Sequence, residues 1–170
     1  LVSFGVLPAI MLYCTTGSCG WICYIPLIIA VFSALRLAKF NLDERQHSGF
    51  LGLPTPACAM ICGSLACFAF SSPESVLASL CHSCWFVPAL SIVLSLLLVS
   101  EIPMFSMKFG KDTVQDRRTG ILRIIFLAAA VLTVCIVAAF RLHWSLTILI
   151  IFSIYIAMNI ILPKYKGDRI

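Results

Sequence analysis

Six apolar stretches separated by short polar segments restrict the fold of this chain more than any other feature. Several of them approach the roughly 20 residues that an α-helix needs to cross a bilayer. The chain is 61% hydrophobic and only 11% charged, far from the quarter or so of charged residues typical of soluble domains. The sequence predicts an all-α, polytopic transmembrane helical bundle with about six crossings, and residues 1–170 form a single integral-membrane domain. The expected crossings are Leu1–Tyr13, Gly20–Ala38, Ala57–Phe70, Cys84–Val99, Ile121–Phe140 and Trp144–Leu162.

The positions of the basic residues predict the orientation of the bundle. Eleven of the twelve Lys and Arg residues lie in or beside two polar loops and the C-terminal tail, and the alternate connections carry only Arg141. Cytoplasmic loops keep an excess of Lys and Arg. The two basic loops and the C-terminus are therefore expected in the cytoplasm. Trp85 and Trp144 are expected near the outer edge as aromatic anchors.

The first basic loop contains the candidate binding residues. Arg36 and Lys39 are three residues apart, so they share a face if the helix continues, and Asn41 follows where the helix is expected to end. Arg36 lies about one turn inside the apolar stretch, where an ionisable residue is costly and commonly functional. Pro54 and Pro56 predict an extended segment before the next helix. These cations suit anchoring to anionic lipids or binding of a phosphate-bearing substrate, and the residues alone leave both open.

Most of the nine Cys residues lie within apolar stretches, where Cys behaves as a small hydrophobic residue. Cys81 and Cys84 form a C-x-x-C in an expected outer loop, which oxidation or zinc could use. Gly63, Ser64 and Ala66 permit close helix packing or a homodimer.

Four stretches, in this order and spacing, resemble the serine-using branch of the CDP-alcohol phosphotransferase family, the bacterial phosphatidylserine synthases. They are "VSFGVLPA" at Val2–Ala9, "FSALRLAKFN" at Phe32–Asn41, "GFLGLPTPA" at Gly49–Ala57 and "IPMFSMKF" at Ile102–Phe109. The resemblance implies an enzyme that transfers the phosphatidyl group of CDP-diacylglycerol to L-serine and releases CMP. It also implies that Arg36, Lys39 and Asn41, with Arg45, bind the substrate phosphates or the serine carboxylate.

The family's catalytic motif, D-x2-D-G-x2-A-R-x8-G-x3-D-x3-D, does not occur in this chain. The resemblance implies that its last Asp lies immediately before Leu1. The ligands of Mg²⁺ or Mn²⁺ are then expected upstream, with no catalytic or metal residue in the chain itself and no activity from the chain alone. A sibling enzyme using glycerol phosphate or inositol, and a transporter or membrane scaffold, are the alternatives. No nucleic-acid partner is expected.

Overall fold

The computed structural model describes residues 1–17, 20–42, 50–104, 116–141 and 143–161, and within them the chain is almost entirely helical. A π-helical turn, η1 (Val2–Val6), leads into α1 (Leu7–Thr15), and the 3₁₀ segment η2 (Gly20–Leu27), which contains Pro26, leads into α2 (Ile28–Leu42). The remaining helices are α3 (Thr55–Ser71), α4 (Val76–His82), α5 (Phe86–Val99), α6 (Asp116–Ala139) and α7 (Ser145–Ile161).

Each predicted apolar stretch contains a helix or a pair of joined helical segments, so the all-α prediction is confirmed. One continuous described helix, Gly20–Asn41, is long and apolar enough by itself to cross a membrane. The helices α3 and α4 meet the same criterion only together, and they bend by 109° at their junction. The other apolar helices, Val2–Thr15, Phe86–Val99, Ile124–Ala139 and Ser145–Asn159, are 10–17 residues long. The total of six crossings therefore stays a prediction.

The sequence analysis treated residues 71–83 as a connection, but they contain the short helix α4. The Ser75 side chain starts this helix by accepting a hydrogen bond from the backbone N–H of Ala78 at 3.1 Å. A serine at the N-cap satisfies a donor that would otherwise lack a partner. The capping serine was therefore the available sequence signal for α4.

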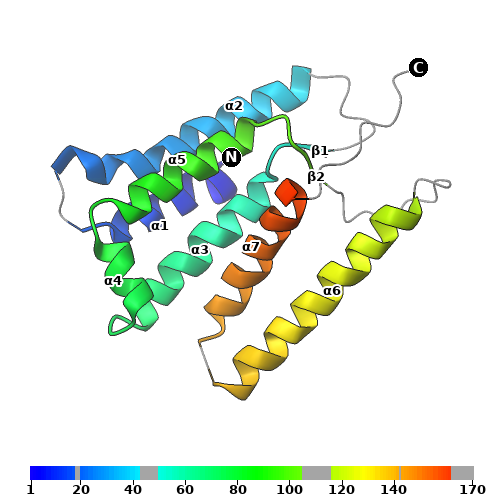
Figure 1. Cartoon of the computed structure of the whole chain (residues 1–170). Helices are drawn as coiled ribbons and strands as arrows, with labels where there is room; N and C mark the ends of the chain where they lie inside the picture. The colour runs from blue at the N-terminus through cyan, green and yellow to red at the C-terminus, as the bar shows by residue number, and fades with distance from the viewer. Residues whose placement is uncertain (18–19, 43–49, 105–115, 142, 162–170) are drawn as a thin grey trace.

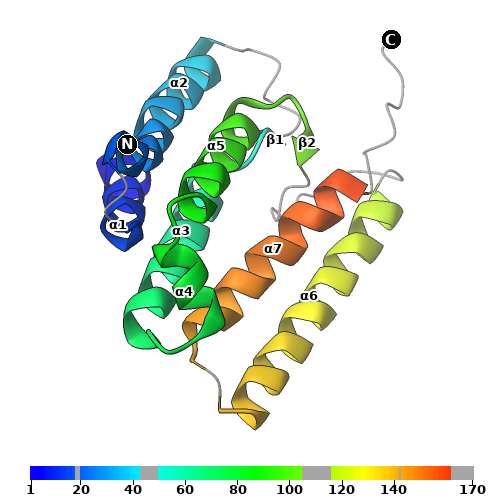
Figure 2. The ribbon, with the colours of Figure 1, turned by 60° about the vertical axis from the view of Figure 1, so that its left-hand side comes forward.

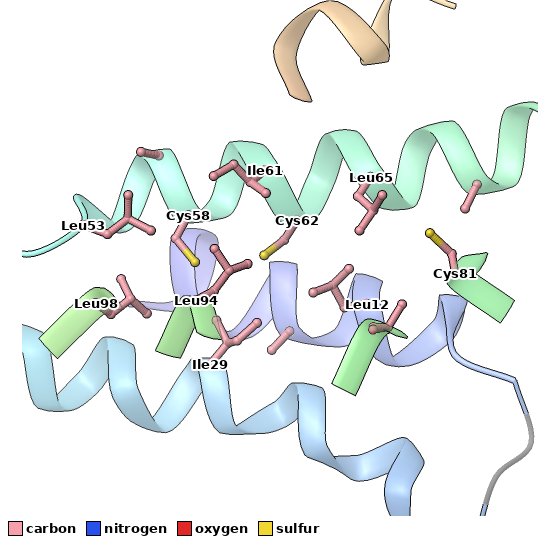
Figure 3. Close-up of a cluster of buried hydrophobic side chains, with 14 of the residues drawn as sticks. Leu12, Ile29, Leu53, Cys58, Ile61, Cys62, Leu65, Cys81, Leu94 and Leu98 are labelled. Atoms are coloured by element: carbon pink, nitrogen blue, oxygen red, sulfur yellow. The ribbon is translucent and has the colours of Figure 1, made fainter. Parts of the chain in front are cut away.

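The helices pack around α3, which contacts α1 on one side and α7 on another, while α2 packs against α5 and α6 against α7 (Figure 1). Between apolar helices in lipid, association depends on close van der Waals packing, which small residues permit. Small side chains of α3 are buried accordingly, among them Cys58, Cys62 and Ala66. Figure 3 shows Cys58 and Cys62 in the cluster with Leu94 and Leu98 of α5 and Ile29 of α2.

Cys58 and Cys62 of α3 are free and buried, as expected of cysteines that act as small hydrophobic residues, whereas Cys14 and Cys135 are free and exposed. Of the predicted small-residue positions, Ser64 and Ala66 are buried. A Cβ added at Gly63 meets no atom within 4 Å, so this position makes no close helix contact within the described chain. The homodimer stays a prediction.

The helix ends that flank the two basic loops lie at the same end of the bundle. Figures 1 and 2 show the C-terminal ends of α2, α5 and α7 there, with the N-terminal ends of α3 and α6. Two short strands, β1 (Phe50–Leu51) and β2 (Pro103–Met104), pair antiparallel at this end, which we call the β end of the bundle. Toward the opposite end, the side chains of Trp21, Trp85 and Trp144 are 90%, 73% and 63% exposed. The helix ends that flank the basic loops and the three tryptophans therefore belong to opposite ends of the bundle, while the orientation in a membrane stays a prediction.

The segment between β1 and α3 packs tightly against the C-terminal end of α5. The backbone N–H of Gly52 donates to the Ile102 carbonyl and that of Leu53 to the Leu97 carbonyl, both at 2.9 Å, and the Leu53 side chain is completely buried. Gly52 has a φ of +75°, and a Cβ there would lie 2.7 Å from the Ser100 carbonyl oxygen. Only glycine adopts this backbone conformation without strain and leaves room for the carbonyl.

We therefore expect Gly52→Ala to lower the free energy of unfolding by at least about 2 kcal/mol, because it adds both backbone strain and a clash with a rigid carbonyl. Thermal or denaturant unfolding of the detergent-solubilised protein measures the effect. Gly63→Ala is the matched control, since its Cβ enters open space in mid-helix and is expected to be neutral or stabilising. Equal stability of the two variants would contradict the tight packing at Gly52.

Candidate functional site

Arg36 is the central residue of the candidate site at the β end of the bundle. It lies on α2, is partly buried, and its Nη1 donates a hydrogen bond to Thr55 Oγ1 at 3.0 Å. Its Nε is buried and has no hydrogen-bond partner among the described residues. A buried donor without a partner costs free energy, more so when it carries charge. Arg36 therefore offers a cationic donor that an acceptor can complete.

Lys39 lies one turn further along α2, on the same face as Arg36, as the sequence predicted. Its Nζ lies 3.2 Å from Glu101 Oε1 and 3.4 Å from the Val99 carbonyl oxygen. A cation at the C-terminal end of α5 interacts favourably with the helix dipole and with the last carbonyls. Lys39 thus connects α2 to the end of α5. Neither Glu101 nor Val99 was predicted as a partner of Lys39.

The other two predicted binding residues contribute less to the observed geometry. Asn41 is exposed in the last turn of α2, which ends at Leu42 as expected. Arg45 lies outside the described residues. The structure therefore brings together Arg36 and Lys39, with Asn41 at the rim.

Two buried polar residues of α7, Tyr155 and Asn159, were not among the predicted site residues. Tyr155 is buried and close enough to Arg36 to interact with it electrostatically. Asn159, also buried, donates from Nδ2 to the Tyr155 carbonyl at 2.7 Å. The two are four residues apart on one helix face, and polar residues in an apolar helix commonly face a functional interior. That spacing was the signal that could have identified them.

The described carboxylates do not fit a divalent-metal site. Among the described residues no three His, Cys, Asp or Glu side chains gather to hold an ion. Glu101 lies beside β2 at the site, whereas Glu74 lies between α3 and α4 at the opposite end (Figure 1). Mg²⁺ and Mn²⁺ require several oxygen ligands around one position, which these two residues cannot supply together.

Cys81 and Cys84 are not joined to each other. Cys81 is a free, buried residue of α4, whereas Cys84 is disulfide-bonded. The C-x-x-C therefore does not act as a pair, although one of its members is oxidised.

No protein-family model matches the chain. The chain is 31% identical over 157 residues to the CDP-diacylglycerol–serine O-phosphatidyltransferases of Mycobacterium bovis and of Mycobacterium tuberculosis strain CDC 1551, a match that covers 86% of this chain and 51% of each relative. It is 37% identical over 118 residues to the protein of the same name from Mycobacterium leprae, over 62% of this chain and 37% of that relative. Over most of its length the chain is therefore similar to proteins named as phosphatidylserine-forming transferases.

The chain spans about half the length of the relatives that it matches most extensively. The helix Gly20–Asn41 is long and apolar enough, by length and composition, to cross a membrane. Arg36 and Lys39 lie in the "RLAKFN" stretch that carried the resemblance, and Thr55 lies in "GLPTP". The Arg36–Thr55 hydrogen bond therefore joins these two stretches directly.

We expect Glu101→Gln to change the free energy of unfolding by less than about 1 kcal/mol, because ion pairs between exposed groups contribute little. The side chains of Lys39 and Glu101 are 35% and 73% exposed. Unfolding in low and in high salt measures the effect, which should shrink as salt screens the pair. Glu74→Gln at the opposite end is the control. A loss above about 2 kcal/mol for Glu101→Gln alone would mean that the pair is a main structural tie.

Proposed function

We propose that the protein containing this chain transfers the phosphatidyl group of CDP-diacylglycerol to L-serine. In this reaction a bond forms between the serine hydroxyl oxygen and the phosphorus that carries diacylglycerol. The bond from that phosphorus to the CMP oxygen breaks, and the hydroxyl proton passes to a base. The observation that carries the proposal is the match over 157 residues to relatives named for this activity.

Arg36 is the residue of this chain that we assign to an anionic group of a substrate. Both substrates carry one, since CDP-diacylglycerol has a diphosphate and serine a carboxylate. The guanidinium can bind a diphosphate or a carboxylate through parallel hydrogen bonds. Its buried Nε lacks an acceptor among the described residues. The first turn of α3 begins beside it at Thr55, where the helix dipole also favours negative charge. These features support anion binding at this position, and they fit the diphosphate of CDP-diacylglycerol and the carboxylate of serine equally well.

We assign Lys39 and Asn41 to the outer part of the same site, and Arg45, which lies outside the described residues, to the same role. The ion pair of Lys39 with Glu101 is partly exposed and therefore weak, so an anionic substrate can displace the Glu101 carboxylate from it. Asn41 is exposed and has both a donor and an acceptor for a polar headgroup.

The divalent metal implied by the family resemblance, Mg²⁺ or Mn²⁺, stabilises charge on the transferring phosphate when it is bound. Because the described carboxylates do not fit such an ion, we assign the described residues to substrate binding. The metal ligands and the general base then belong to residues outside them.

We expect Arg36→Ala in the full-length protein to lower phosphatidyl transfer at least about tenfold, because a charge-assisted hydrogen bond to the substrate is lost. Arg118→Ala, near the start of α6, is the matched control and should have little effect. Release of CMP and labelled phosphatidylserine from CDP-diacylglycerol and labelled L-serine gives the rates. Equal losses in the two variants would contradict the assignment of Arg36.

The same assay separates the proposal from its alternatives when the acceptor is varied. Incorporation of glycerol phosphate or inositol in place of serine would identify a sibling enzyme. No transfer to any of the three acceptors would favour a transporter or scaffold.

We also propose that the chain crosses a bacterial inner membrane about six times, with its β end on the cytoplasmic side. The basic residues beside the helix ends at the β end, and the exposed tryptophans toward the other end, support this orientation.

Alkaline phosphatase fused after Ser72 is therefore expected to be active, because this enzyme works only when exported. A fusion after Ile170 should be inactive, while a fluorescent protein at that position should fluoresce. The reverse pattern at the two sites would show the opposite orientation, and activity at both would contradict the proposed number of crossings.

A further inference from the structure

Thr55 accepts a hydrogen bond from the Arg36 guanidinium through its side chain. Its Oγ1 accepts a hydrogen bond from Arg36 Nη1 at 3.0 Å, across the loop that separates α2 from α3. Nothing in the comparisons assigns a role to this threonine. The contact suggests that the Thr55 hydroxyl orients Arg36 and does not cap α3, the helix on which Thr55 lies.

The start of α3 supports that interpretation. A threonine at a helix N-terminus ordinarily caps the helix by accepting a hydrogen bond from a backbone N–H. Here the N-cap position is Pro54, and no side-chain capping bond forms. The Thr55 hydroxyl is therefore not needed to begin α3, and it is directed at a charged residue of another helix.

The backbone around Thr55 is well determined by its neighbours. Pro54 and Pro56 restrict φ on both sides, and the backbone N–H of Leu53 is bonded to the Leu97 carbonyl. Leu53 itself is completely buried. A hydroxyl on so constrained a segment can hold the guanidinium in one orientation.

The choice of Nη1 determines which edge of the guanidinium remains for a ligand. The group is planar and presents its N–H donors in a fixed fork, and Nε and Nη2 point the same way along one edge. Thr55 binds Nη1, outside that edge, while Nε is buried without a partner among the described residues. The Nε–Nη2 edge can hold a carboxylate or phosphate through two parallel bonds while Nη1 stays bonded to Thr55.

We propose that Thr55 is a positioning residue, which holds the Nη1 atom of Arg36 so that the Nε–Nη2 edge faces the anionic group of a substrate. This inference rests on the proposed function, in which Arg36 binds that group. It adds the residue that orients Arg36 and the edge through which Arg36 acts.

The test compares Thr55→Val, which removes the hydroxyl at nearly constant shape, with Thr55→Ser, which keeps it. In the full-length protein we expect Thr55→Val to lower kcat/KM for phosphatidyl transfer about tenfold. The loss should fall mainly on the KM of whichever substrate Arg36 holds, and the KM of the other should stay unchanged. Thr55→Ser should retain most of the activity. Thr133→Val is the control, since the Thr133 hydroxyl bonds only to the Ala129 carbonyl of its own helix, α6, away from the site.

A second comparison separates positioning from a general loss of structure. If Thr55 acts through Arg36, then Thr55→Val should have no further effect in an Arg36→Gln background. Equal and additive losses in the two backgrounds, or wild-type kinetics of Thr55→Val, would overturn the proposal.

Failure of the proposed function is distinguished by measuring stability without any assay of transfer. Thermal unfolding of the wild type, Thr55→Val, Arg36→Gln and the double variant gives the coupling between the two side chains. A full-length protein with no transfer activity but with clear coupling would reject the reaction and retain the Arg36–Thr55 contact. Absence of coupling would overturn the positioning role, whatever the reaction. If Thr55→Val does not fold, Thr55→Ala takes its place in both cycles.

Discussion

The packing of residues 52–53 against the C-terminal end of α5 is the constraint on which the candidate site depends. Two backbone hydrogen bonds, the buried Leu53 side chain and the absence of a Cβ at Gly52 hold this segment in place. Thr55 comes two residues after Leu53, so the packing of this segment also sets the place from which Thr55 contacts Arg36. Lys39 reaches the same end of α5 through Val99 and Glu101. One close approach of backbone to backbone therefore brings α2, α3 and α5 together at a single point.

The surroundings of this point explain why a partly buried cation is tolerated there. Some hydroxyl groups elsewhere in the apolar helices bond to carbonyls of their own helix, as Ser91 does to Val87 and Ser153 to Leu149. Such bonds satisfy polar groups where water is scarce. Ser33 Oγ and Ser95 Oγ, like Arg36 Nε, are buried without a described partner, but only Arg36 carries a charge. An unpartnered cationic donor is the more costly case, and it agrees with our proposal that Arg36 binds an anionic group of a substrate.

Much of the helical organisation could be predicted because length and hydropathy act locally. The end of α2 near Asn41, the start of α3 beside Pro54 and the burial of Cys58 and Cys62 all follow from residues close together in the sequence. Two elements, α4 and the β1–β2 pair, were not predicted. The helix α4 was missed because a short apolar segment after a capping serine looks like a connection, and β1–β2 because two-residue strands have no periodicity to detect.

Some features of the candidate site could also be predicted from neighbouring residues, and others could not. Three properties could be predicted from composition or from neighbouring residues: the chain is apolar and helical, its cations lie beside the ends of particular helices, and Arg36 and Lys39 share a face. Three contacts appear only in the folded chain: Arg36 bonds to Thr55, Lys39 pairs with Glu101, and Arg36 interacts electrostatically with Tyr155 of α7. The physical reason is that such contacts depend on how helices distant in the sequence pack, and a small residue such as Gly52 shows where two backbones meet only once they are folded.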